Sequence, residues 1–234
     1  MPEPNKSVST TGTSPDIPII FEDNHLLVVN KPPGILSQED HTERPDLLNL
    51  CKEYIRKEYD KPGNVFLGLL HRLDRPVGGV MVFAKTSKAA SRISEQIRGR
   101  KVKKRYRAIV IGNPPPNGVL EHHLVKNEKK NMVDVVSGPT RRSKLAKLSF
   151  TVVDRYQNLA LLDINLETGR AHQIRVQFAE IGAPVWGDKR YAKTEEAGSI
   201  ALHAYSFKIK HPTLKETMTF KAELPLSKPW NQLI

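Results

Sequence analysis

Asp74 is the residue of the segment HRLDRPVGG (71–79) that could do chemistry, as a nucleophile or a general base. The segment places polar groups between two apolar runs, VFLGLL and VMVFA, where a buried sheet is expected. An ion pair of Asp74 with Arg72 or Arg75 would also explain the charges, because buried charges are usually paired. The two glycines at the end of the segment allow close backbone approach, which we interpret as a pocket floor that a ligand reaches.

A second polar cluster, ETGRAHQIRVQ (167–177), leads into a predicted amphipathic helix over 171–182. Its first turns carry Arg170, His172 and Arg175. His172 and Arg175 are three residues apart, so they share one helix face next to the apolar stripe. The face could be a solvated basic surface, or its side chains could point into a cleft.

Tyr106 lies in a predicted strand within KKRYRAIV. A tyrosine in a strand usually packs in the core, but one surrounded by cations suggests a stacking platform beside a phosphate track. The flanking cations, which we predict to contact a phosphate backbone, are Lys103, Lys104, Arg105 and Arg107.

The net charge of the chain is +12, from 37 Lys and Arg against 25 Asp and Glu. This balance indicates a polyanionic partner, with nucleic acid as the first hypothesis, although solvated lysines alone would also give it. The cations are clustered in RGRKVKKRYR (98–107) and RRSKLAK (141–147). We therefore predict further phosphate contacts from Arg141 and Arg142.

Several function classes are excluded by the same residues. Leu73 interrupts the His-Arg-Asp order of a kinase catalytic loop, and no glycine-rich phosphate loop precedes it. His122 and His123 lie on a predicted strand and point to opposite faces, so we expect no metal site. No apolar run is long enough for a membrane span.

The chain of 234 residues contains one cysteine, Cys51, which we expect to pack in a helix. No internal disulfide is possible, so we predict a reducing, cytoplasmic location. Residues 1–16 predict a disordered polar tail. We expect one α+β domain over 17–234, with a mainly antiparallel mixed sheet, flanking helices and a central cleft. The predicted elements are a hairpin over 18–34, helices over 45–59, 87–99 (N-cap Ser87) and 171–182, and strands over 65–70, 78–85 and 104–112, followed by a mostly β half.

In this order the motifs HRLDRPVGG, KRYRAIV, GRAHQIRVQ, GAPVWGDKRY and LHAYSF resemble the RluA family of pseudouridine synthases. The resemblance implies Asp74 as the catalytic carboxylate and Tyr106 as the aromatic side chain against the target base. It also implies Arg175 as the partner of Asp74, Leu202 as apolar packing in the pocket, and Arg72 close to the RNA. From the same motifs we add His71, Arg170 and His172 as substrate-binding candidates.

Two features depart from the family pattern. Val77-Gly78-Gly79 replaces the usual Thr-Ser-Gly, so two hydroxyls are missing near Asp74. Only about 16 residues precede the first predicted strand, so we expect no separate N-terminal RNA-binding domain of the kind that many members carry.

The implied reaction breaks the C1′–N1 bond of a uridine in RNA and joins the sugar to C5, which requires no cofactor. Asp74 could attack C6 of the base, add to C1′ or remove a sugar proton, and Arg175 should keep it ionised. The sequence does not decide between ribosomal and transfer RNA, and we expect a monomer. Two alternatives are an inactive RNA-binding protein of the same fold and a glycoside hydrolase, which would need a second carboxylate.

Overall fold

The structure is a computed structural model that describes residues 17–40, 42, 44–128, 130–192 and 199–233. The predicted tail over 1–16 lies outside the described residues. The helices are α1 (Leu47–Glu58), α2 (Ser87–Arg98), α3 (Gln173–Glu180) and the short 3-10 helix η1 (Trp230–Gln232). The strands are β1 (Ile19–Glu22), β2 (Leu26–Lys31), β3 (Gly68–Leu69), β4 (Gly78–Ala84), β5 (Lys103–Ile111), β6 (Asn117–Asn127), β7 (Met132–Val136), β8 (Lys144–Tyr156), β9 (Leu159–Leu166), β10 (Leu202–Lys210) and β11 (Thr217–Lys221).

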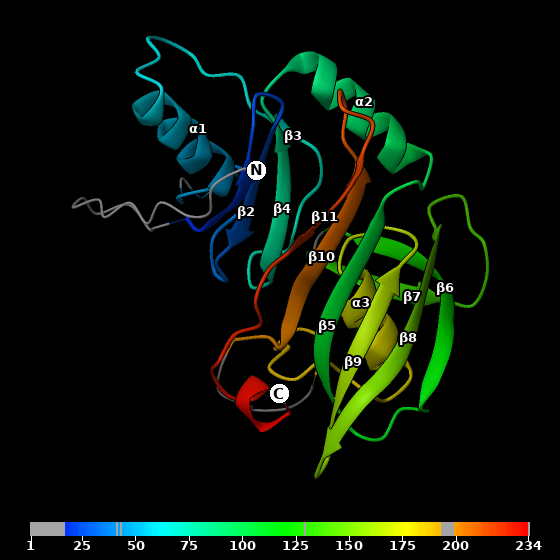
Figure 1. Cartoon of the computed structure of the whole chain (residues 1–234). Coiled ribbons are helices and arrows are strands. Elements are labelled where there is room, and N and C mark those ends of the chain that lie inside the picture. Colours follow the sequence, from blue (N-terminus) through cyan, green and yellow to red (C-terminus); the bar gives the residue numbers. More distant parts are fainter. Residues whose placement is uncertain (1–16, 41, 43, 129, 193–198, 234) are drawn as a thin grey trace.

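These strands form one 11-stranded sheet in the order β1-β2-β4-β10-β5-β9-β8-β6-β7, with β3 on β4 and β11 on β10 (Figure 1). Only the β4–β10 pair is parallel among the described strands. Strand β10 is central because it joins the N-terminal strands β1 to β4 to the long antiparallel β5–β9 half. The predicted α+β fold with a mainly antiparallel mixed sheet is confirmed.

Helices α1 and α2 cover opposite faces of the β2–β4 region. Cys51 of α1 packs in one cluster with Leu27, whereas Ile93 of α2 packs in another with Leu26. Adjacent residues of a strand point to opposite faces, so the two helices must lie on different sides of it. Cys51 is buried in α1, as predicted.

Helix α3 packs against the other half of the sheet, where it contacts β6 and β7. Phe178 of α3 meets Phe150 of β8 edge to face, with ring centroids 5.1 Å apart. This contact anchors the helix whose N-terminus carries the polar residues of the second cluster.

Three details of the predicted elements are wrong. The strand over 65–70 is reduced to the two-residue β3, because the chain leaves the sheet for the Asp74 loop. Thr86, rather than Ser87, caps α2, and its Oγ1 accepts a hydrogen bond from the Ala89 amide at 3.2 Å. The helix predicted over 171–182 is shorter, from Gln173 to Glu180, and Ile181 beyond its end is 37% exposed. Among the described residues, no helix has both the length and the apolar character to cross a membrane.

Candidate active site

A cavity of about 1340 Å³ opens where the Asp74 loop faces the N-terminal end of α3. Strands β5 and β10 contribute to its wall. The structure thus brings the three sequence clusters together. The predicted site residues that line this cavity are His71, Arg72, Asp74, Lys104, Tyr106, Arg170, His172, Arg175 and Leu202.

Two side chains from the segment over 31–37 form hydrogen bonds to the backbone of the loop that carries Asp74. The fully buried Lys31 donates to the carbonyl oxygens of Arg75 at 3.1 Å and Val77 at 2.8 Å. Ser37 Oγ donates to the Leu73 carbonyl at 2.7 Å and accepts from the Leu73 amide at 3.0 Å. The backbone on both sides of Asp74 is therefore fixed, which positions its carboxylate.

Lys31 is also close enough to Asp74 for their charges to interact. Burial lowers the pKa of the Lys31 amine to about 7, and the Asp74 charge acts in the opposite direction. Lys31 bonds to three carbonyl oxygens, including that of Pro32 at 3.1 Å. Three acceptors require three N–H donors, which only the ammonium form has.

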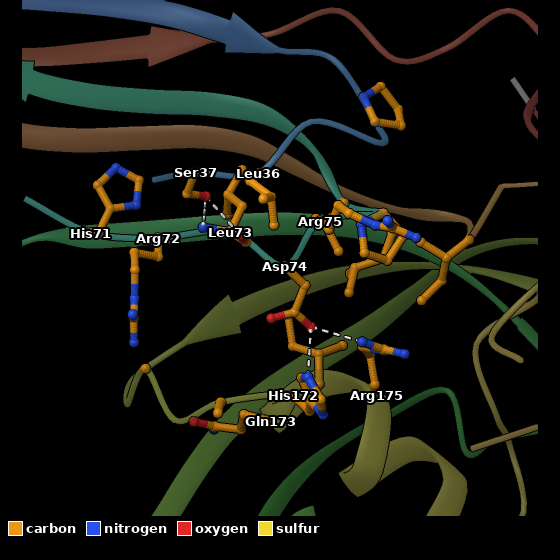
Figure 2. Close-up of a pocket in the computed structure, with 18 of the residues that line it drawn as sticks. Leu36, Ser37, His71, Arg72, Leu73, Asp74, Arg75, His172, Gln173 and Arg175 are labelled. Carbon is orange, nitrogen blue, oxygen red and sulfur yellow. Dashed lines mark hydrogen bonds and ion pairs between the residues drawn. The ribbon is translucent and has the colours of Figure 1, made fainter. Parts of the chain in front are cut away.

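Arg175 joins Asp74 to a second carboxylate, Asp188. Its Nη1 donates to Asp74 Oδ2 at 2.9 Å (Figure 2), while its Nε and Nη2 form a fork to Asp188, each at 2.7 Å. Burial alone would lower the pKa of Arg175, but the hydrogen bonds and charges of Asp188 and Asp74 raise it. The Asp188 side chain is 0% exposed, Arg175 5% and Asp74 27%, so Asp74 is the one of the three that a substrate can reach.

His172 approaches Asp74 from the same side of the cavity (Figure 2). Its Nε2 lies 3.8 Å from Asp74 Oδ2, and its Nδ1 is 2.8 Å from the Tyr191 hydroxyl. Burial lowers the pKa of His172, with Arg175 acting in the same direction and Asp74 opposing both. His172 is the N-cap of α3 with a φ of 51°, so it reaches Asp74 from a left-handed residue and not from a helical turn.

Tyr106 and Leu202 form the apolar part of the wall. They are 8% and 5% exposed. Burial raises the pKa of the Tyr106 phenol, and the Asp74 charge adds to the effect, so the ring is neutral at physiological pH. A neutral aromatic face beside a carboxylate suits contact with a planar base.

Alternate residues of the Asp74 loop point to opposite sides. Figure 2 shows Arg72 and Asp74 projecting into the cavity while His71 points away from them. His71 stacks on Phe207 at 4.6 Å between ring centroids, and its Nε2 accepts from the Val82 amide at 3.1 Å. Burial lowers the pKa of His71 to about 3, so the ring is neutral. These contacts hold His71 within the protein, whereas Arg72 is exposed.

The predicted RNA-backbone cations are divided between several places. Lys104 lines the cavity, and burial lowers its pKa. Lys103 does not line it, because neighbouring residues of a strand point to opposite sides. Arg105 and Arg107 both pair with Asp163 of β9 instead of facing the cavity. Arg141 and Arg142 are exposed in the turn before β8, outside the cavity lining.

The interpretation of the Gly78-Gly79 pair is wrong. Gly79 has a φ of 116°, and a Cβ added there would lie 2.3 Å from the Ala204 carbonyl oxygen. The close neighbour is therefore the backbone of β10, which pairs with β4 at this point, and not a ligand. Val77, Gly78 and Gly79 are all buried, so this departure from the family motif is accommodated by strand packing.

Sequence reasoning missed Asp188, Lys31, Ser37 and Tyr191. Asp188 lies within the quoted GAPVWGDKRY motif, where an acid after an apolar run was the available signal. Lys31 ends the buried strand LLVVNK, and a lone cation at such a place was a signal of the same kind. Ser37 and Tyr191 act through contacts between distant segments, for which the sequence carries no local pattern.

The chemistry of the site is that of one accessible, ion-paired carboxylate in a cavity with an apolar wall. Among the described residues there is no group of three or more His, Cys, Asp or Glu that could hold a metal ion. Asp74 can serve as a nucleophile or a base.

Comparisons with known proteins agree with this arrangement. Residues 25–180 match the family model for RNA pseudouridylate synthase. The dual-specificity RNA pseudouridine synthase RluA of Escherichia coli is 35% identical over 216 residues, which cover 89% of this chain and 93% of that protein. The ribosomal large subunit pseudouridine synthase D of Zymomonas mobilis is 33% identical over 230 residues, covering 90% of this chain and 70% of that protein.

A solved structure shows the same fold. Human RNA pseudouridylate synthase domain containing 4 superposes with a TM-score of 0.75 at 24% sequence identity, covering 89% of this chain and 88% of that chain. The match of the family model extends over most of the cavity, from β2 to the end of α3. The resemblance seen in the motifs is thereby confirmed, and the chain belongs to the RNA pseudouridine synthases.

Proposed function

We propose that the chain converts uridine to pseudouridine in ribosomal or transfer RNA, with Asp74 as the catalytic carboxylate. The observation that carries this proposal is the Asp74–Arg175–Asp188 arrangement. In this arrangement the Asp74 carboxylate is exposed at the cavity, and the fully buried Asp188 carboxylate pairs with the other side of the Arg175 guanidinium. Two of the related proteins are named for ribosomal large subunit RNA and for dual specificity, which supports a structured RNA substrate.

The reaction is a rearrangement within one nucleotide. The C1′–N1 bond breaks, the uracil turns, and a C1′–C5 bond forms. The proton leaves C5 and N1 gains one, so atoms and electrons balance without a cofactor. Asp74 provides the nucleophile or base, and Arg175 holds it ionised in a partly closed pocket. Tyr106 stacks on the base, and Leu202 packs beside it.

The target base must leave its stack before Asp74 can reach it. Extruding a base costs a few kcal/mol, least where it is already unpaired, so single-stranded loops are the easier substrates. Arg72 is exposed beside Asp74 and extends in the same direction, which suits the space that the base leaves. Full activity of Arg72→Ala on a structured RNA would remove this role.

We also propose that residues 17–234 act as one catalytic domain, as a monomer in the cytoplasm. The single sheet through all described strands supports one domain. The free thiol of Cys51 suits a reducing compartment.

The test of the proposed function is chemical analysis of RNA. Ribosomal and transfer RNA from cells that lack this protein would be incubated with it. Pseudouridine, which has the same mass as uridine, would then be mapped by carbodiimide derivatisation and primer extension. We expect new pseudouridine at a defined position of one RNA class. Unchanged nucleosides in both classes, with RNA binding retained, would favour an inactive RNA-binding protein. Release of free uracil would favour a glycoside hydrolase.

A further inference from the structure

We propose that a second groove, separate from the catalytic cavity, binds the phosphate backbone of the RNA segment that flanks the target uridine. The groove has a volume of about 410 Å³. It lies where the C-terminal half of α2 meets the start of β5, the end of β10 and the turn between β10 and β11. The proposal rests on the proposed function, because it takes RNA as the substrate.

Cationic side chains dominate the lining of this basic groove. The cations are Arg92, Lys101, Lys103, Lys208, Lys210 and Lys215. Glu95 is the one carboxylate that lines it among the residues that the structure describes. Among the residues that the structure describes, no carboxylate oxygen comes within 4.0 Å of any of these six cations. Arg92 donates to the Pro212 carbonyl oxygen at 2.8 Å, and the charge of the five lysines is available to an external anion.

The arrangement of two of these lysines favours an anion between them. Lys103 of β5 lies directly opposite Lys208 of β10 in the antiparallel ladder. Like charges at directly opposite positions destabilise a strand pair. Lys210 follows two residues later on the same side of β10, which adds to the repulsion. A bound phosphate chain would relieve it.

The middle of the same strand is treated differently. Arg105 and Arg107 of β5 share the carboxylate of Asp163, which balances one of their two charges within the sheet. Lys103, at the start of β5, has no such partner among the described residues. The cations at this end of the sheet are thus left for something outside the chain.

The position of the groove fits an RNA strand that continues from the catalytic cavity. Ile97 of α2 lines the cavity and the neighbouring Gln96 lines the groove, so the last turn of α2 separates the two. The exposed Arg98 and Arg100 lie at that boundary. Figure 1 shows the end of α2 next to the start of β5, and the β10–β11 turn beside the middle of α2. An RNA strand that leaves the catalytic cavity past α2 therefore enters the basic groove.

The lining also indicates which part of the RNA is bound. It contains no Phe, Tyr or Trp among the described residues, so it offers no stacking platform for bases. Lysines act on phosphates as point charges and carry no sequence information. The groove should therefore bind RNA of any sequence that is long enough to extend from the cavity.

The experiment compares two triple variants that remove the same charge. One is Lys208→Gln/Lys210→Gln/Lys215→Gln in the groove. The matched control, Lys57→Gln/Lys61→Gln/Lys88→Gln, changes three lysines that are also exposed but lie outside both cavities. Affinity for oligouridylates of about 30 and about 8 nucleotides would be measured over a range of salt concentrations.

For the longer RNA we expect the plot of log affinity against log salt to be shallower for the groove variant. Its negative slope should shrink in magnitude by about 2, since each single-strand phosphate contact contributes about 0.7. The control variant should change it much less, and the short RNA should bind all three proteins alike. Equal effects of both triple variants, or no effect of the groove variant on the longer RNA, would overturn the proposal. Because the readout is binding, absence of pseudouridine formation would refute the proposed function and leave this test intact.

Discussion

Charges around Asp74 are matched within the protein, whereas charges in the basic groove beside α2 are not. Arg175 lies between two carboxylates at 2.7 and 2.9 Å, and its side chain is 5% exposed. Lys208 and Lys210 are exposed and have no carboxylate partner among the described residues. Buried charges need partners because desolvation is costly, so they fix geometry. Exposed, unmatched cations cost little and remain free to bind a polyanion.

The largest expected effect on stability is in the matched centre. Arg175→Ala leaves the fully buried Asp188 without its counterion, so the free energy of unfolding should fall by about 3–5 kcal/mol. Arg175→Lys keeps the positive charge but cannot form the two-pronged contact with Asp188, so its free energy of unfolding should fall by less than that of Arg175→Ala. Urea unfolding of both variants measures this. An Arg175→Ala protein as stable as wild type would show that the buried charges around Asp74 do not depend on their pairing.

Lys31 tests whether the loop beneath Asp74 must be held. Lys31→Met removes the donor from three carbonyl oxygens. The Arg75 carbonyl keeps the Gly34 amide, whereas the buried Val77 carbonyl loses the Lys31 donor, which should cost about 1–3 kcal/mol. We expect lower stability and slower single-turnover modification, with RNA affinity unchanged. The exposed Lys57→Met is the control and should alter neither. Loss of RNA affinity in Lys31→Met, with the modification rate intact, would contradict the positioning role.

Buried neutral histidines predict a loss of stability in acid. Burial lowers the pKa of His203 to about 4, from 6.5 in the unfolded chain. Between these values the unfolded chain binds the proton and the folded chain does not. The stabilising contribution is therefore complete above pH 6.5 and is lost as the pH falls toward 4, at about 1 kcal/mol per pH unit.

Urea unfolding at several pH values between 7 and 4.5 or so would measure this slope. The His203→Gln variant, which cannot titrate, should show a shallower dependence than wild type. Identical slopes for the two proteins would show that His203 is protonated in the folded chain as readily as in the unfolded one.

The smallest effect is expected at the exposed turn before β8. Arg141→Gln/Arg142→Gln should change the free energy of unfolding by less than about 0.5 kcal/mol, since neither side chain is buried. If both contact phosphates, the negative slope of log affinity against log salt for a long RNA should shrink in magnitude by about 1.4. An unchanged slope would remove these two residues from the RNA interface.

The sequence predicted those parts of the site that lie in contiguous polar motifs. Asp74, Arg175 and His172 meet because a loop and a helix start face each other. The predicted shared helix face of His172 and Arg175 is wrong, because His172 precedes the first turn of α3. Because alternate residues of a strand point to opposite sides, however, Arg105 and Arg107 do not face the cavity with Tyr106. They pair with Asp163, which the cluster of basic residues in the sequence does not indicate. Helices α1 and α2 and the β1–β2 hairpin followed from local periodicity, whereas α3, predicted to be amphipathic, is buried on all sides from Gln173 to Phe178.

The missed features depend on contacts across the sheet. Lys31 reaches Val77, 46 residues away, and Ser37 reaches Leu73, 36 residues away. Gly79 is required by the neighbouring backbone of Ala204 in β10, a parallel pairing that no local pattern indicates. Asp188 lay in a quoted motif, but its partner becomes evident only when α3 packs beside it.

The central claim is that Asp74 carries the chemistry and not the binding of RNA. Its most direct test measures tritium release from RNA labelled at uracil C5, together with RNA affinity, for wild type and Asp74→Asn. Joining the sugar to C5 must expel that hydrogen. We predict release by wild type, a rate at least about 10⁴-fold lower for Asp74→Asn, and equal affinities. Tritium release by Asp74→Asn at a rate close to that of wild type would contradict the account.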